Sequence, residues 1–82
     1  MKRTVEVKIP KEQLDRTAAS FIRAANEFSC RISIAQGGRS VNAKSLLGFL
    51  SLMQEGGSVD LSAEGAEAEK ALETLAGILE AK

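Results

Sequence analysis

The sequence contains no histidine, tryptophan or tyrosine, and Cys30 is its one cysteine among 82 residues. Without histidine, a Ser-His-Asp or Cys-His catalytic arrangement is excluded, as is any histidine-bearing zinc site. One cysteine cannot supply a four-thiolate metal site or an intrachain disulfide. The chain also lacks a P-loop and a Gly-x-Gly-x-x-Gly run. We therefore expect no metal, no other cofactor and no enzymatic activity, and a function that depends on docking to other proteins.

The chain has no excess of positive or negative charge, because 11 lysines and arginines balance 11 aspartates and glutamates. A general nucleic-acid binder needs a surplus of cations to displace counterions from phosphates, and binding to anionic membranes by bulk charge needs the same. The longest apolar stretch, Leu46 to Met53, is far shorter than the roughly 20 residues that span a bilayer. With a lone cysteine and no signal peptide, we expect a cytoplasmic protein that binds neither nucleic acid nor membrane.

The apolar residues that are present predict one α+β domain over residues 1–82. Period-2 alternation predicts four strands: Thr4 to Ile9, Cys30 to Ile34, Arg39 to Asn42 and Val59 to Ala63. Helical stripes predict three helices: about Asp15 to Phe28, Ser45 to Met53 and about Ala66 to Ala81.

Several residues mark where these elements begin and end. Pro10 ends the first strand, Gly37-Gly38 predicts a hairpin turn, and Gly56-Gly57 breaks the chain after the second helix. Asp15 suits either the N-cap of the first helix or the positive end of its dipole. The resulting order is βαββαβα. Because every strand has one apolar and one polar face, we expect an antiparallel sheet with helices on one side.

Ser45 lies where the second helix is expected to begin, and it has two interpretations. Its hydroxyl oxygen suits an N-cap, which accepts a backbone N–H that has no partner inside the helix. Alternatively, Ser45 is a phosphorylation site, since a phosphate there would face free N–H groups and the positive end of the helix dipole.

The second helix is more apolar than one buried face requires. If Phe49, Leu52 and Met53 point inward, the remaining side chains Leu46, Leu47 and Leu50 are left partly exposed beside Ser45. An exposed apolar cluster usually marks a protein-binding surface. The alternative is that these leucines only cover a thin core.

Arg16 lies near the start of the first helix. A helix N-terminus is a natural anion site, so Arg16 could hold a phosphate there. It could equally be a solvated arginine.

These features together resemble the histidine-containing phosphocarrier (HPr) family of the bacterial sugar phosphotransferase system. The resemblance covers nearly the whole chain. It is carried by Val41-Asn42-Ala43-Lys44-Ser45, by Ala18-Ala19-Ser20-Phe21 and by Leu61-Ser62-Ala63-Glu64-Gly65. It implies an open-faced sandwich with sheet order 1-4-2-3 and all three helices on one face.

The chain departs from this family at the phospho-accepting histidine. Without gaps, Leu14 occupies that position, Arg16 matches the family's arginine and Thr17 replaces its proline; a one-residue shift would put Asp15 there instead. The sequence is therefore similar to the catabolite-repression variant of HPr, which lacks the histidine and keeps a regulatory serine. The resemblance assigns that serine to Ser45, the neighbouring arginine to Arg16, and the family's docking surface to Leu46, Leu47 and Leu50.

The resemblance implies a regulatory protein in carbon catabolite control. Its serine would be phosphorylated by an HPr-type, ATP-dependent kinase, and its partners would be a transcription regulator or phosphotransferase enzymes. Two other interpretations remain: a constitutive binding module that is never phosphorylated, and a carrier that uses Asp15. We expect a monomer or a weak dimer.

Overall fold

The computed structural model describes residues 1–7, 9–53 and 57–80. Its elements follow the predicted βαββαβα order, with one short 3-10 helix, η1, added before the first helix. They are β1 (Lys2–Val7), η1 (Lys11–Gln13), α1 (Leu14–Asn26), β2 (Arg31–Gln36), β3 (Arg39–Asn42), α2 (Leu46–Met53), β4 (Gly57–Glu64) and α3 (Ala68–Glu80).

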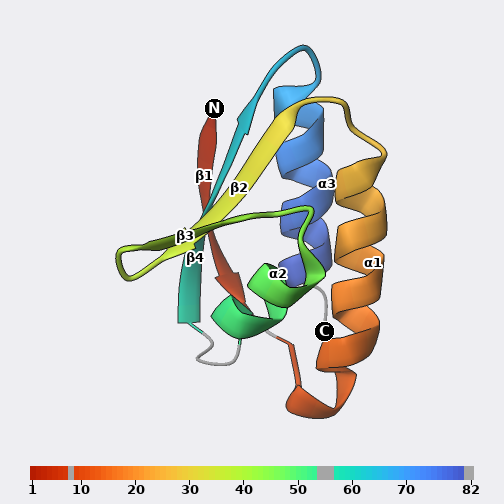
Figure 1. Cartoon of the computed structure of the whole chain (residues 1–82), viewed down its shortest axis with the longest axis vertical. Coiled ribbons are helices and arrows are strands. Elements are labelled where there is room, and N and C mark those ends of the chain that lie inside the picture. The colour runs from red at the N-terminus through yellow and green to blue at the C-terminus, as the bar shows by residue number, and fades with distance from the viewer. Residues whose placement is uncertain (8, 54–56, 81–82) are drawn as a thin grey trace.

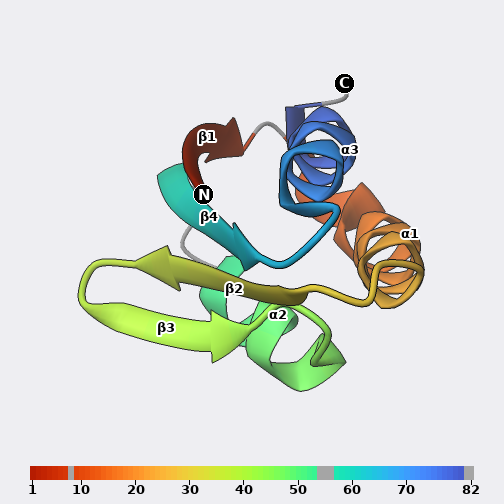
Figure 2. The ribbon, with the colours of Figure 1, turned by 90° about the horizontal axis from the view of Figure 1, so that it is seen from above.

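The four strands form one antiparallel sheet in the order β1-β4-β2-β3, which confirms the predicted topology. The helices cover one face of this sheet, and α1 and α3 run side by side along it (Figure 1 and Figure 2). The β2–β3 hairpin closes at Gly37 and Gly38, whose φ angles are 55° and 84°. Two consecutive positive φ angles define a type I′ turn, which matches the twist of the paired strands.

The core lies between the sheet and the helices. Along β4 the buried residues Val59, Leu61 and Ala63 alternate with more exposed ones, as expected for a sheet with one covered face. The rings of Phe21 on α1 and Phe49 on α2 are both fully buried and stack with their centroids 4.4 Å apart. This contact fixes α2 against α1. Among the described residues no polar or charged side chain is buried.

The predicted bounds of α1 were wrong at both ends. The helix begins at Leu14 with Gln13 at its N-cap, because η1 leads straight into it; Asp15 is therefore not the N-cap and lies in the first turn instead. At the other end, the N–H of Glu27 donates to the Ala24 carbonyl at 3.1 Å and that of Phe28 to the Ala25 carbonyl at 3.3 Å, so each reaches back only three residues. This tightening ends α1 at Asn26, two residues early.

Other boundaries moved by one or two residues. β1 ends at Val7 rather than Ile9, and Lys8 lies outside the described residues. α3 begins at Ala68 because the chain first bends at Gly65, where φ is +133°. The predicted helix end at Ala81 and the predicted break at Gly56 also fall outside the described residues. No helix in the described part of the chain has the length and apolar character to cross a membrane.

Candidate functional site

Ser45 is held in a tight turn between β3 and α2. The side-chain oxygen of Asn42 accepts the backbone N–H of Lys44 at 2.8 Å, and the Asn42 carbonyl accepts the N–H of Ser45 at 3.0 Å. The Oγ of Ser45 then accepts the N–H of Gly48 at 3.3 Å. Ser45 is thus the N-cap of α2, as predicted, and it is exposed to solvent.

Gly48 leaves space for this arrangement. A Cβ atom at this position would lie 3.0 Å from the Cβ of Val41 on β3 and 3.5 Å from the Oγ of Ser45. The absence of a side chain therefore allows the first turn of α2 to approach β3. It also keeps the space beside the serine hydroxyl open.

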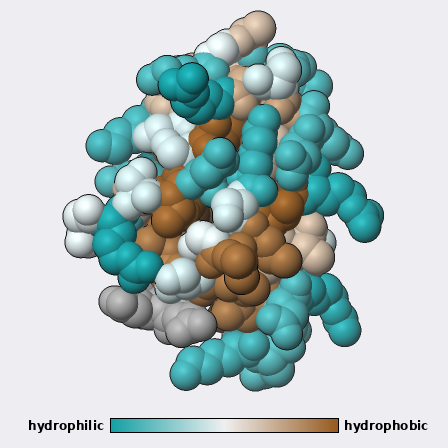
Figure 3. Space-filling model, viewed as in Figure 1, coloured by the Kyte–Doolittle hydropathy of each residue, from teal (hydrophilic) through white to brown (hydrophobic). Residues whose placement is uncertain are grey.

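Next to Ser45, α2 presents the leucine patch, which consists of Leu46, Leu47 and Leu50. Leu46 is 47% exposed and Leu47 is 81% exposed. Leu50 is half-buried and packs against the core. Hydrophobic side chains gather on the lower part of the surface, over α2, with hydrophilic ones around them (Figure 3).

The other apolar side chains of α2, Phe49, Leu52 and Met53, are buried. The predicted division of the helix into an inward set and an outward set is therefore confirmed. Of the outward leucines, Leu50 packs partly against the core, whereas Leu46 and Leu47 place an exposed apolar surface directly beside the Ser45 hydroxyl.

Two cationic side chains near this site were missed by sequence reasoning. The Nη2 of Arg39 donates to the Oγ of Ser51 at 2.8 Å and so links β3 to α2. The Nζ of Lys44 donates to the carbonyl of Phe28 at 2.7 Å in a partly buried position. Both bonds join residues that lie 12 or more positions apart, so no local pattern could reveal them. The turn at Asn42 could have been predicted from the sequence, because an asparagine side chain commonly accepts the backbone N–H of the residue two positions later.

The structure separates the residues at the family's histidine position. Leu14 is half-buried against the core, whereas Asp15 is exposed in the first turn of α1. Arg16 is exposed in the same turn, and it makes no hydrogen bond or ion pair with another described residue. The helices α1 and α2 are in contact, but no hydrogen bond or ion pair between described residues holds Arg16 beside Ser45.

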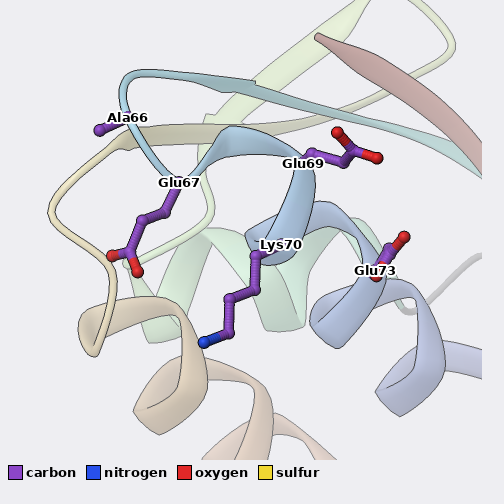
Figure 4. Close-up of a pocket in the computed structure, with 5 residues that line it drawn as sticks. All are labelled: Ala66, Glu67, Glu69, Lys70 and Glu73. Carbon is purple, nitrogen blue, oxygen red and sulfur yellow. The ribbon is translucent and has the colours of Figure 1, made fainter.

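A second surface feature is a shallow hollow at the start of α3, lined by Ala66, Glu67, Glu69, Lys70 and Glu73 (Figure 4). Glu67 and Lys70 extend to one side of it, and Glu69 and Glu73 to the other. Within the described ranges, no group of three or more histidine, cysteine, aspartate or glutamate side chains is arranged to hold a metal ion. The hollow has no buried polar group that would fix a ligand.

The Ser45 hydroxyl has few polar contacts. It is exposed, and among the described residues the one polar contact of its Oγ is the backbone N–H of Gly48, so no described side chain is placed to remove its proton. A four-stranded open-faced sandwich with sheet order β1-β4-β2-β3 and its helices on one face is the fold of the phosphocarrier class.

Comparisons with known proteins identify the family within this class. The model of the family described as "PTS HPr component phosphorylation site" matches residues 1–81. The chain therefore belongs to the HPr family, whose members are phosphocarriers and not enzymes.

The chain is similar to both branches of this family. It is 37% identical over 81 residues to the HPr-like protein Crh of Halalkalibacterium halodurans, covering 98% of this chain and 96% of that protein. It is 41% identical over 76 residues to the phosphocarrier protein HPr of Buchnera aphidicola, covering 92% and 89%. The crystal structure of HPr-C-His from Thermoanaerobacter tengcongensis superposes with a TM-score of 0.89 at 37% identity, covering 98% and 91%.

Proposed function

We propose that this chain is a regulatory HPr-like protein whose docking to other proteins is controlled by phosphorylation of Ser45, as part of carbon catabolite regulation. The single observation that carries the proposal is the position of Ser45. It is an exposed N-cap serine, and the two most exposed leucines of the described residues, Leu46 and Leu47, follow it directly. One modification can therefore change the charge at the edge of the apolar surface.

Loss of the carrier function follows from the chemistry at the start of α1. Leu14 has no nucleophile, and its side chain packs against the core. Asp15 has a carboxylate, but the family's phosphoryl acceptor is a histidine, and the chain contains none. The proline of the family pattern is also replaced, by Thr17. Overall identity to Crh and to HPr is comparable, so it does not distinguish the two branches of the family. The residues at the start of α1 do distinguish them, and they favour the regulatory branch.

The modification itself is a transfer of the γ-phosphoryl group of ATP. The Oγ of Ser45 forms the new bond to phosphorus, ADP leaves, and the hydroxyl proton passes to a base of the kinase. The product carries about −1.5 to −2 charges at neutral pH. It lies at the N-terminus of α2, where the helix dipole and free N–H groups stabilise an anion. Arg16, exposed and without a partner among the described residues, is available to contact it.

The partners that fit this mechanism are proteins. We propose an HPr-type serine kinase as the modifying enzyme, and a transcription regulator or phosphotransferase enzymes as the proteins that bind the leucine patch. A buried apolar contact with a charge at its border lets a partner distinguish the two forms. We further propose that the protein works in the cytoplasm, as a monomer or weak dimer.

Incubation with an HPr kinase and ATP, followed by mass spectrometry, tests the modification. We expect one added phosphate on the peptide that contains Ser45, and none on Ser45→Ala. Ser51 lies on the same helix, and its Oγ accepts a hydrogen bond from the Nη2 of Arg39, so it provides an internal comparison. If the intact protein gains no phosphate on Ser45, the proposal is overturned.

A constitutive binding module is the second candidate, and the exposure of the leucine patch in the unmodified protein favours it. A pull-down from cell extract with Ser45→Asp and Ser45→Asn separates the two candidates. Both variants keep a good N-cap, but only the aspartate adds charge. If regulation operates, the set of captured proteins differs between them. If it is identical, the constitutive module is correct.

A further inference from the structure

Lys44 connects the Ser45 site to the end of α1. Its backbone N–H is held by the side chain of Asn42 at 2.8 Å, and its Nζ donates to the Phe28 carbonyl at 2.7 Å. The lysine is half-buried, and Phe28 is 8% exposed, so this is a shielded contact rather than a surface one. Lys44 therefore joins the N-terminus of one helix to the chain just after the C-terminus of another.

A phosphate on Ser45 would compete for the same ammonium group. The end of a helix carries the equivalent of about −0.5 elementary charge, spread over its last carbonyls. A phosphoserine carries about −1.5 to −2 charges and three acceptor oxygens. Because Ser45 directly follows Lys44, the phosphate would offer the flexible lysine side chain a full anion, which is a stronger acceptor than the neutral Phe28 carbonyl that it now contacts.

The Phe28 carbonyl lies in a turn whose loosening can be detected. Ser29 and Cys30 follow it, and Cys30 is 4% exposed. A Cβ atom at Gly65 would lie 2.8 Å from the Cβ of Cys30 and 3.1 Å from its Cα, so the β4–α3 connection packs directly on this residue. Cys30 is the one thiol of the chain, and a reagent reaches it only when the turn opens.

We propose that Lys44 is a switch element: charge on Ser45 draws its ammonium group away from the Phe28 carbonyl and loosens the α1–β2 turn around Cys30. This inference rests on the proposed function, since it concerns the same serine, and it adds that modification changes a region beyond the docking helix. The turn and the leucine patch then respond to the same event.

The test uses phosphoserine incorporated at position 45 during synthesis, so that the result does not depend on any kinase. The rate of Cys30 alkylation is measured in the unmodified and phosphorylated proteins at two low urea concentrations, where local opening is insensitive to urea. We expect phosphorylation to raise the rate roughly threefold to tenfold, the change that loss of about one hydrogen bond produces. An unchanged rate overturns the proposal.

Two variants make the test specific. Phosphoserine at Ser40 adds the same charge in a different place. Val41 faces α2, and successive residues of a strand point to opposite faces, so Ser40 lies on the open face of the sheet. It should leave the labelling rate unchanged. Lys44→Met should label faster than wild type before modification and should show no further rise when Ser45 is phosphorylated. An equal rise in Lys44→Met would contradict the role of Lys44.

A second measurement follows the hydrogen bond itself and needs no variant. Phe28-Ser29 is the one Phe-Ser pair in the sequence, so labelling phenylalanine with ¹³C at the carbonyl and serine with ¹⁵N leaves a single correlation peak for this peptide bond. We expect its carbonyl resonance to move upfield when Ser45 is phosphorylated, because the carbonyl loses a donor. A resonance that does not move overturns the proposal. Failure of a kinase to modify Ser45 would overturn the proposed function and leave this response of the turn intact.

Discussion

The helices α2 and α3 both pack against the core, but they differ in what they expose to solvent. α3 has 13 residues, six of them buried, and its exposed positions are mostly charged or polar, including Glu69, Lys70 and Glu73. α2 has eight residues, three of them buried, and contains no charged residue at all. A helix needs only one apolar stripe to cover a core. The exposed leucines of α2 are therefore in excess of what folding requires, as the proposed docking role would demand.

Replacing Phe49 by alanine should have the largest effect on stability, because it removes the buried side of α2. The substitution deletes a fully buried ring that stacks on Phe21. We expect a loss of about 3–5 kcal/mol in the free energy of unfolding. Urea unfolding followed by far-ultraviolet circular dichroism measures it, since the chain has no tryptophan or tyrosine for fluorescence.

Phe49→Leu, which keeps most of the volume, provides the milder comparison if the alanine variant does not fold. We expect it to lose clearly less stability than Phe49→Ala. A loss of under about 1 kcal/mol for Phe49→Ala would mean that α2 is not part of the core.

The N-cap of α2 should have an intermediate effect. Ser45→Ala removes the acceptor of the Gly48 N–H and should cost about 1 kcal/mol. Ser45→Asn restores a capping oxygen, so its free energy of unfolding should return close to that of wild type. If alanine and asparagine are equally destabilising, the effect does not come from the cap.

Much of the difference between α2 and α3 could be predicted from the sequence, because the apolar stripe of each helix reflects local periodicity. The inward side chains of α2, the hairpin at Gly37-Gly38 and the cap at Ser45 all follow from patterns within a few residues. The bond from Lys44 to Phe28 could not be predicted, since it depends on how two helix ends meet in space. The end of α1 was placed two residues late for a related reason: Phe28 continues the apolar stripe although the backbone has already left the helix.

Two glycines inside these helices offer a matched test of how each helix is packed. A Cβ atom at Gly77 on α3 meets nothing within 4 Å, whereas one at Gly48 on α2 comes within 3.0 Å of Val41. Alanine gains helix propensity at both positions. We expect Gly77→Ala to raise the free energy of unfolding by about 0.5–1 kcal/mol. Gly48→Ala should show no such gain, because the contact with Val41 offsets it. Equal gains in urea unfolding would show that β3 yields freely to α2.

The smallest effect on stability should come from Leu47, the most exposed leucine of α2, and it is the substitution that tests the comparison most directly. Leu47 is 81% exposed, so Leu47→Ser removes almost no buried surface, and we expect the free energy of unfolding to stay within about 0.5 kcal/mol of wild type. If the leucine patch exists for docking, the same variant should lose most of its captured partners in a pull-down. Thr74→Ser on α3 is the control, because it changes an exposed position of the charged helix and should keep all of them. Retention of every partner by Leu47→Ser would show that the exposed leucines merely cover the core, and the difference between the two helices would then carry no functional meaning.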